Sequence, residues 1–296
     1  MFCSDGGTQR VLSVQSHIPS ACYRVELSGG LSIVGDHNMT FSLQCRKWRN
    51  RLQMWIRNQS SKFAKKRFRR PLAVRSVAQM LDEGLDDNRN RKKWALTNIE
   101  PLRYPHVDLP VPPYVLGLWL GSMTKSGRHW VRGKDMERIS KKCRRHGFFI
   151  TQNRGEFFFR PSVRESFTFA GAPIPDKIPS SYLESDVESR QMLLEGLIDS
   201  EDAKKQAHGE ECYTIQDSWL SAKRKQQLLE SLGHTTSLTK RDDRARFALN
   251  FCKILTPAPK NRRQIVKIDK IRPRQCVHIV TEHDFVAAEG FLSVKM

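Results

Sequence analysis

Hydrophobic and polar positions form two kinds of pattern, one at the ends of the chain and one in the middle. Residues 1–45 and 263–296 alternate apolar and polar positions in short runs such as CYRVEL and CVHIVTE. A period of two predicts half-buried β-strands. Because both ends carry this pattern around a more helical centre, we expect them to meet in one β-rich domain that the middle interrupts. Two unrelated β-edges are the alternative.

The middle of the chain repeats one order of elements. A first apolar helix, in YVLGLWLG, is followed by the strand HWVRG, the amphipathic helix KDMERISKKCRRHG, and the strand pair FFITQ and EFFFRP. A second apolar helix, QMLLEGLID, is followed by CYTIQDS, LSAKRKQQLLESLG, and the pair TSLTK and RFALNF. Gly233 suits a left-handed C-cap of the second amphipathic helix. This order predicts an internal duplication with a pseudo-two-fold axis, in repeats 112–187 and 188–262.

Glycines mark one face of each apolar helix. Gly117 and Gly121 are four residues apart and therefore share a face, and Gly196 marks the equivalent face of the second helix. Because glycine has no side chain, these faces predict a close approach of the two helix backbones.

The second apolar helix ends in three acids, Asp199, Glu201 and Asp202. Carboxylates at the end of a helix lie unfavourably against the negative end of its dipole. They therefore need a cation, and a divalent ion such as Mg²⁺ takes oxygen ligands of this kind. A solvated helix end is the alternative interpretation.

The net charge of the chain predicts a polyanionic partner. The 296 residues include 51 Lys+Arg against 31 Asp+Glu, a net charge of +20. This excess predicts that the partner is nucleic acid, ahead of an acidic membrane surface. A basic structural or ribosome-associated protein is the alternative interpretation of the charge. No apolar run approaches the ~18 residues needed to span a bilayer, and the first ten residues lack a signal-peptide layout. We expect the seven cysteines, which form no CxxC pair, to be reduced intracellular thiols.

One segment concentrates the positive charge. Between Asp36 and Asp82 there is no acid, against twelve Lys/Arg from Arg46 to Arg75. Its densest part, SKFAKKRFRRP, fits a phosphate-binding arm, a nuclear-import address or a solvated charged face. We assign residues 61–111 to a basic linker or arm, which ends in the proline-rich YPHVDLPVPPY.

Several of these segments resemble known families. LLEGLIDSED resembles the signature of the LAGLIDADG (DOD-type) homing endonucleases, and PPYVLGLWLG resembles its first copy as found inside inteins. CSDGGTQRVLSV, CYRVELSGGLSIVGDHNMTF and VHIVTEHDFVAAEGF resemble the flanks of the Hint (intein splicing) domain. The resemblance covers nearly the whole chain except residues 44–100. It implies an α+β fold, with two αββαββ-type repeats in residues 112–262 inserted in a Hint-like β domain of residues 1–60 and 263–296.

The resemblance also implies a site. Glu201 is the expected catalytic residue and, with Asp199, the expected metal ligand for Mg²⁺. The acid of the first motif is replaced by Ser122, whose hydroxyl is not a charged ligand, and the lysine that often precedes the second copy is replaced by Asp176. The resemblance therefore implies a monomer that binds duplex DNA with cleavage weakened or lost. The residues expected to face DNA are Arg128, Arg132, Arg154, Arg160, Lys240, Arg244 and Arg246.

Other functions remain open at this point. Lys295 and Met296 stand where an intein has its His-Asn pair, so we expect protein splicing to be lost. A regulatory or interaction protein that keeps the fold without enzymatic activity is the main alternative, and a nickase using Glu201 alone is another. We expect no membrane association, and a nuclear location in a eukaryote or a cytoplasmic one otherwise.

Overall fold

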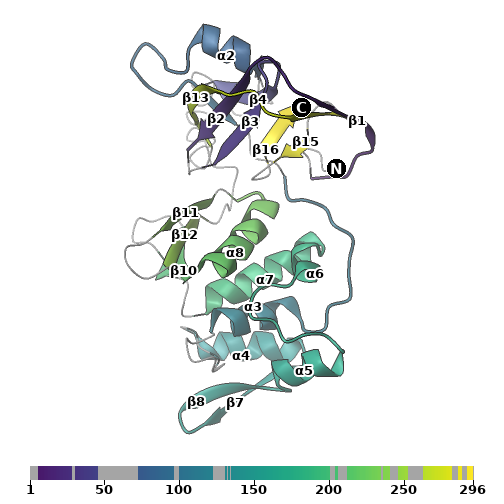
Figure 1. The fold of residues 1–296 in the computed structure, drawn as a ribbon. Coiled ribbons are helices and arrows are strands. Elements are labelled where there is room, and N and C mark those ends of the chain that lie inside the picture. The colour runs from purple at the N-terminus through teal and green to yellow at the C-terminus, as the bar shows by residue number, and fades with distance from the viewer. Residues whose placement is uncertain are drawn as a thin grey trace, which may run out of the picture. The chain divides into compact units, whose positions relative to one another are not determined.

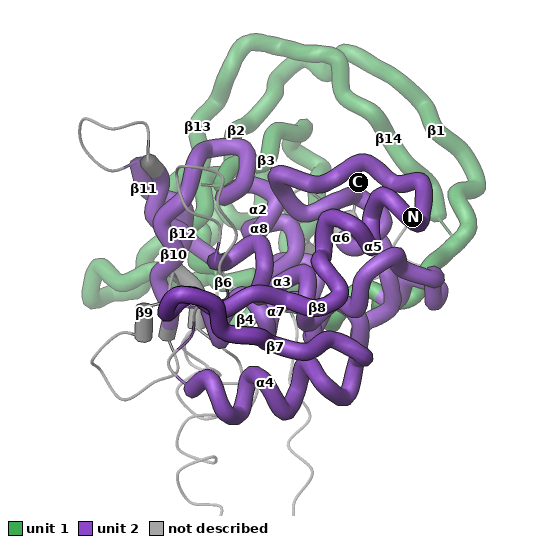
Figure 2. Tube along the Cα trace, turned by 90° about the horizontal axis from the view of Figure 1, so that it is seen from below, with its two compact units in different colours: residues 1–102, 254–296 green, residues 103–253 purple. Residues whose placement is uncertain are grey.

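A computed structural model describes most of the chain as two compact units. The described residues are 6–28, 31–45, 73–96, 100–122, 131, 133, 135–200, 204–205, 212–234, 236–240, 246–252, 263–281, 286–288 and 292–295. They form a mixed α+β fold with several small antiparallel sheets (Figure 1), as the sequence predicts. Unit 1 comprises residues 1–102 and 254–296, and unit 2 comprises residues 103–253 (Figure 2).

Strands from both ends of the chain pair with each other in unit 1. In one sheet β2 lies between β3 and β13, and β1 pairs with β14 in a separate ribbon. In a further sheet β4 pairs with β5, β6 and β16, and β16 pairs with β15. The two ends therefore lie in one β-rich unit, in agreement with their shared pattern. The strands are β1 (Val11–His17), β2 (Cys22–Leu27), β3 (Ser32–Gly35), β4 (Thr40–Cys45), β5 (Ala73–Ser76), β6 (Trp94–Leu96), β13 (Ile265–Ile271), β14 (Cys276–Thr281), β15 (Val286–Ala288) and β16 (Leu292–Lys295).

Part of the segment predicted as a basic linker belongs to the core of unit 1. Residues 73–96 form β5, the helix α2 (Val77–Glu83) and β6. The helix begins with a capping box between Ser76 and Gln79, and it buries Val77 and Met80. Because these apolar side chains and Trp94 pack with the strands, the linker prediction fails for residues 73–96. The dense basic run SKFAKKRFRRP lies outside the described residues.

Unit 2 consists of helices and two antiparallel sheets. One is the hairpin β7–β8, and the other has the order β11-β12-β10-β9. Its helices are α3 (Pro113–Gly121), α4 (Met136–Arg145), α5 (Val163–Phe169), α6 (Ser180–Leu183), α7 (Val187–Asp199) and α8 (Trp219–Ser231). Its strands are β7 (Phe149–Asn153), β8 (Glu156–Arg160), β9 (Lys204–Lys205), β10 (Cys212–Ser218), β11 (Thr236–Lys240) and β12 (Arg246–Cys252).

The predicted elements of the middle recur in the predicted order. After α3 come α4, β7 and β8, and after α7 come β10, α8, β11 and β12. Gly233 has φ +81°, so the predicted left-handed end of α8 is confirmed. Of the predicted strand HWVRG, only Val131 and Gly133 are described, and the Val131 amide donates to the Phe157 carbonyl of β8 (2.8 Å). The helices α5 and α6 stand between the two series.

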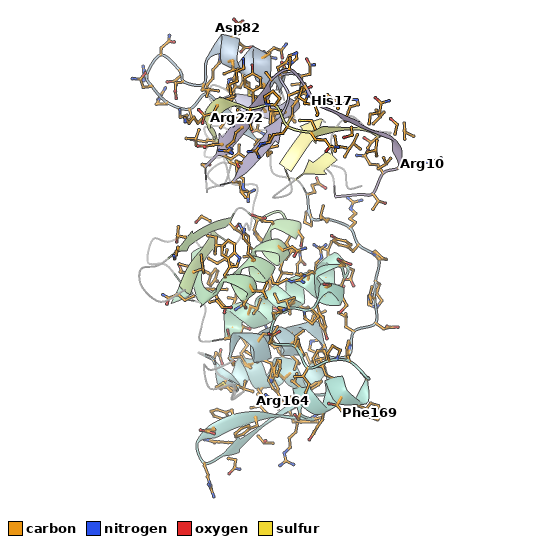
Figure 3. The ribbon with its side chains drawn as sticks, viewed as in Figure 1. Arg10, His17, Asp82, Arg164, Phe169 and Arg272 are labelled. Atoms are coloured by element: carbon orange, nitrogen blue, oxygen red, sulfur yellow. The ribbon has the colours of Figure 1, made fainter. Side chains whose placement is uncertain are left out.

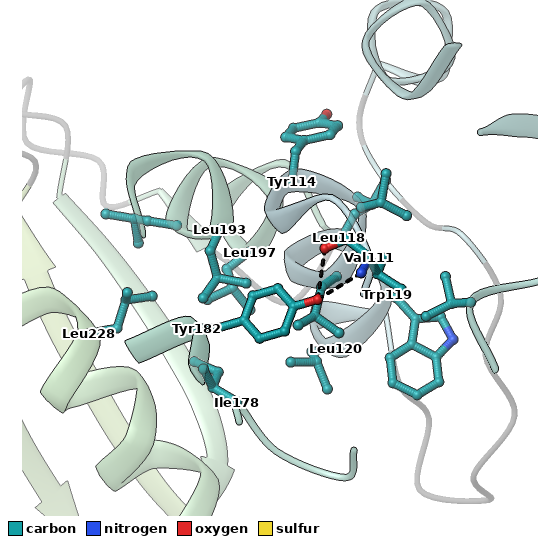
Figure 4. Packing of buried hydrophobic residues seen from close by; sticks show 14 of the residues in the cluster. Val111, Tyr114, Leu118, Trp119, Leu120, Ile178, Tyr182, Leu193, Leu197 and Leu228 are labelled. Carbon is teal, nitrogen blue, oxygen red and sulfur yellow. Dashed lines mark hydrogen bonds between the residues drawn. The ribbon is translucent and has the colours of Figure 1, made fainter. Parts of the chain in front are cut away.

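The core of unit 2 surrounds α3. All nine residues of this helix are buried, so it is covered on every side. The Tyr182 hydroxyl of α6 donates to the Val111 carbonyl (2.7 Å) and accepts from the Val111 amide (3.0 Å), which fixes the proline-rich entry to α3 (Figure 4). None of the helices in the described part of the chain is long and apolar enough to cross a membrane.

Candidate nucleic-acid interface

The glycines of α3 and α7 lie at a direct contact between the two helix backbones. A Cβ atom on Gly117 would lie 2.2 Å from the Leu193 carbonyl oxygen, and one on Gly196 would lie 2.2 Å from the Tyr114 carbonyl oxygen. Distances this short exclude any side chain at either position. The close approach predicted from the sequence is therefore present, and it is reciprocal between the two helices.

The C-terminal ends of the two helices also meet. A Cβ on Gly121 would lie 2.2 Å from Oγ of Ser200, whose hydroxyl donates to the Leu197 carbonyl (2.7 Å). Ser122, which the resemblance aligns with the acid of the first motif, follows α3 directly. It is 5% exposed, and its amide donates to the Leu118 carbonyl (3.1 Å). Glu201, the expected catalytic residue, lies outside the described residues, as does Asp202.

Asp199 is held by cations from the protein itself. Its carboxylate, 6% exposed, accepts hydrogen bonds from the Tyr114 hydroxyl (2.9 Å), the Arg138 guanidinium and the Lys142 ammonium (3.3 Å). Arg138 and Lys142 both come from α4, and Lys142 also bonds Glu195 (2.7 Å). These cations offset the unfavourable position of a carboxylate at a helix C-terminus.

The contacts of Asp199 also change the proton affinities around it. Burial, followed by the negative charge of Asp199, raises the pKa of the Tyr114 hydroxyl well above its usual range. Burial opposes the charge of Arg138, but the Asp199 carboxylate outweighs this effect and raises the pKa of Arg138. At neutral pH the Tyr114 phenol is therefore neutral and Arg138 is a cation.

Asp199 does not fit as a ligand of the Mg²⁺ that the resemblance implies, and Glu201, the other expected ligand, lies outside the described residues. Both oxygens of Asp199 are engaged by Arg138, Lys142 and Tyr114. Ser122 offers a neutral hydroxyl where the resemblance implies an acid. Across the part of the chain that the structure describes, there is no group of three or more His, Cys, Asp or Glu side chains that could hold a metal ion. The geometry favours a structural ion-pair cluster at Asp199.

We expect Asp199→Asn to lower the free energy of unfolding by about 2 kcal/mol. A neutral amide cannot pair with two cations, and it leaves Lys142 and Tyr114 with weaker partners. Half of the Arg138 side chain is exposed, so solvent screening limits the loss. Urea denaturation measures the change. The matched control is Glu195→Gln on the same helix, which removes one exposed partner of Lys142 and should cost less than about 0.5 kcal/mol. Equal losses for the two variants would contradict a structural role for Asp199.

A second internal carboxylate in unit 2 is also paired. Asp217, near the end of β10, lies 2.6 Å from the Lys225 ammonium and 2.6 Å from the Ser221 hydroxyl, both on α8. Burial raises the pKa of Asp217, but the Lys225 charge dominates together with the hydrogen bonds, and the net effect is a lowered pKa. The Asp217–Lys225 ion pair links β10 to α8. This structural role explains why the two charges are there, and no functional role is needed.

The strands of unit 2 place polar side chains and two phenylalanines on the face away from the core. In the β7–β8 hairpin, Ile150, Phe157 and Phe159 pack on the core, so the alternate positions point outward. In β10 and β11 the core positions are Ile215 and Leu238. The outward positions are Phe149, Thr151, Phe158 and Arg160 in the hairpin, Thr214 and Gln216 in β10, and Ser237 and Thr239 in β11. Hydroxyl, amide and guanidinium groups of this kind bind phosphates and base edges.

The cations predicted to face DNA are distributed unevenly. Arg160 is exposed on the outward face of β8. Arg154 (φ +49°) and Gly155 (φ +83°) form the two-residue turn of the hairpin, which puts Arg154 at its tip. Lys240 ends β11 on the strand face that Leu238 uses for packing, and position 246 opens β12 opposite Ser218. Three of the predicted residues lie outside the described part of the chain: Arg128, Arg132 and Arg244.

The neutral outward residues Thr214, Gln216, Ser237 and Thr239 were not predicted as candidates, because the sequence reasoning selected cations only. Strand alternation was the signal that could have identified them.

No protein-family model matches the chain, and a search of curated proteins finds no matching relative.

Proposed function

We propose that the chain is an intein-derived protein of the LAGLIDADG homing-endonuclease type that binds duplex DNA through unit 2, with cleavage weakened or lost. The observation that carries this proposal is the reciprocal glycine contact between α3 and α7. The two segments that resemble the paired signature are the two that touch. A chance resemblance in two separate segments would not require their glycines to meet.

The arrangement around this contact supports the same function. Each of the two helices is followed by a further helix and by antiparallel strands, so unit 2 consists of two like series of elements. Duplex DNA has a backbone that is nearly two-fold symmetric, which two like halves can follow. Unit 1 is built from both ends of the chain, and unit 2 is inserted between them, as expected for an endonuclease nested in a Hint-like domain.

Two observations in unit 2 favour a loss of cleavage within this proposal. Ser122 is buried in place of the first acid, and Asp199 is bound to Arg138 and Lys142. Both features affect cleavage and leave DNA binding untouched. They favour a DNA-binding protein over an active nuclease, and the nickase alternative then depends on Glu201 alone.

We expect the affinity for duplex DNA to fall steeply with salt. A protein that contacts six to ten phosphates loses roughly 10³–10⁵ in affinity between 50 and 200 mM salt. Fluorescence anisotropy with a pool of random-sequence duplexes measures the slope, and selection from genomic fragments then identifies a site. The slope is that of the logarithm of the binding constant against the logarithm of the salt concentration. Arg160→Gln and Arg154→Gln should each reduce the magnitude of this slope by about one.

The matched control for these variants is Lys141→Gln, because Lys141 is an exposed cation on α4, in the helical layer. It removes the same charge and should leave the slope unchanged. An affinity that barely responds to salt would contradict the proposed DNA binding. A slope that Lys141→Gln reduces as much as Arg160→Gln would show that the outward strand face is not the DNA contact.

A further inference from the structure

Two thiols from opposite ends of the chain lie together in unit 1. Cys22 begins β2 and is fully buried, and Cys276 begins β14 and is partly exposed. Their Sγ atoms are 3.7 Å apart, although 254 residues separate them in the sequence. We propose that Cys22 and Cys276 are an oxidisable dithiol, which forms an intramolecular disulfide that links β2 to β14.

The surrounding backbone holds the two sulfur atoms in place. Cys22 lies opposite Ile271 of β13, and Cys276 lies opposite His17 of β1, so both cysteines are at paired ends of strands. The Arg274 amide donates to Cys22 Sγ (3.2 Å), and the Cys22 thiol is 3.6 Å from the Arg274 carbonyl oxygen. A disulfide has an S–S bond of about 2.05 Å, so bond formation requires the sulfurs to approach by less than ~2 Å.

Of these two cysteines, Cys276 is partly exposed and Cys22 is buried. Cys276 lines a pocket of about 700 Å³ together with His17, Asp36, Thr40 and Arg274. His17, which is labelled in Figure 3, ends β1. It lies opposite Cys276 in the pairing of β1 with β14. Cys22 is 0% exposed. A small oxidant in the pocket therefore reaches Cys276 first, and Cys22 is placed behind it as the resolving thiol.

The reaction is balanced with hydrogen peroxide as the oxidant. The Cys276 thiol first releases its proton, and the thiolate attacks one peroxide oxygen. The O–O bond breaks, Cys276 becomes a sulfenic acid, and the departing hydroxide takes up that proton and leaves as water. The Cys22 sulfur then attacks the sulfenic sulfur, the S–S bond forms, and a second water leaves. The two thiols lose two electrons and two protons in total, and one peroxide accepts them.

The environment of Cys276 makes this oxidation slow at neutral pH. Burial, then the neighbouring Cys22 and the charge of Asp36, raise the pKa of the Cys276 thiol to about 11. The other charged or titratable groups lining the pocket are Arg274, His17 and His278. Because the thiolate is the nucleophile, the rate of oxidation should rise roughly tenfold for each pH unit from 7 to 9.

We test the proposal by oxidation of the full chain in its native state. After treatment with hydrogen peroxide and quenching with an alkylating reagent, non-reducing peptide mapping should show a Cys22–Cys276 linked peptide. Measured before alkylation, the intact mass should fall by two hydrogen atoms. Closing so long a loop should raise the Tm by roughly 10 °C, and a dithiol reductant should reverse the rise.

Three variants separate the roles of the sulfurs. Cys276→Ser should abolish the linked peptide. Cys22→Ser should leave Cys276 as a sulfenic acid that dimedone traps, a signature that a merely structural cysteine would not give. Cys45→Ser, on β4 of the same unit, should change neither result. Oxidation of Cys45 in the wild-type chain without any Cys22–Cys276 peptide would overturn the proposal. The same peptide yield from urea-denatured chain would also overturn it.

Discussion

Gly196→Val is expected to lower the free energy of unfolding of unit 2 by on the order of 4 kcal/mol. A Cβ at this position would lie 2.2 Å from the Tyr114 carbonyl oxygen and 2.7 Å from the Leu118 amide nitrogen. Both are backbone atoms of α3 and cannot move aside as a flexible side chain would. The helices must therefore separate, and the leucines that pack between them, such as Leu193 and Leu197, lose contacts. Denaturant titration followed by tryptophan fluorescence and near-UV circular dichroism measures the change.

The matched control is Gln191→Val, because Gln191 is exposed on the same helix. It reports the helix propensity of valine alone, about 0.5 kcal/mol or less. Gly117→Val should be as costly as Gly196→Val, because a Cβ there meets the Leu193 carbonyl at 2.2 Å. The double variant should cost less than the sum, since both changes disrupt one contact. Equal stability of Gly196→Val and Gln191→Val would show that the helices do not touch at these glycines.

Local periodicity was sufficient to predict most elements of unit 2. The amphipathic spacing of Ile139 and Cys143 predicts α4, and the alternation around Ile215 predicts β10; both elements are present. The start of α7 was predicted less accurately, because the helix begins at Val187 and the prediction placed its start near Arg190. The N-cap Asp186 explains the difference: it accepts from the Ser189 amide (2.9 Å), a signal that hydrophobic spacing does not contain.

Features that depend on distant partners could not be predicted from the sequence. The cations on Asp199 come from α4, 57 and 61 residues away, and only the packing of α4 beside α7 brings them together. The thiols of Cys22 and Cys276 form no local motif. In the segment at residues 73–96, the basic charge of the preceding residues concealed the few apolar side chains that join the core of unit 1.

The burial of Arg190 is another feature that could not be predicted from the sequence. A charged residue inside the second apolar helix gives no sign of complete burial, yet it is 0% exposed. Its guanidinium donates to the Ser185 carbonyl (2.8 Å) and to the Ser231 carbonyl (2.9 Å). Burial lowers the pKa of Arg190 to about 10. The guanidinium is satisfied by carbonyl groups from the turn before α7 and from the end of α8, which only the folded chain brings together.

Cleavage of both strands of a duplex by the unmodified chain is expected to be slower than cleavage by an enzyme with both acids by roughly 10²–10³-fold or more. This prediction rests on the proposed function. Ser122 provides no negative charge at the first motif, and Asp199 of the second is already bound to Arg138 and Lys142. The measurement is incubation with a genomic fragment library in Mg²⁺ and, separately, in Mn²⁺, followed by sequencing of the ends. Any residual activity should be nicking of one strand that Glu201→Gln abolishes.

Ser122→Asp is the variant that tests the reason for this loss. If the missing carboxylate limits the reaction, the aspartate should raise the cleavage rate on DNA that the unmodified chain binds but does not cut. Ser122→Asn has nearly the same volume without the charge, and it is the matched control. The position is 5% exposed and follows a helix C-terminus, so the new charge is also expected to lower stability. Melting curves of both variants therefore accompany the assay. Efficient double-strand cutting by the unmodified chain at a defined site would show that the acid of the first motif is not at position 122 or is not needed.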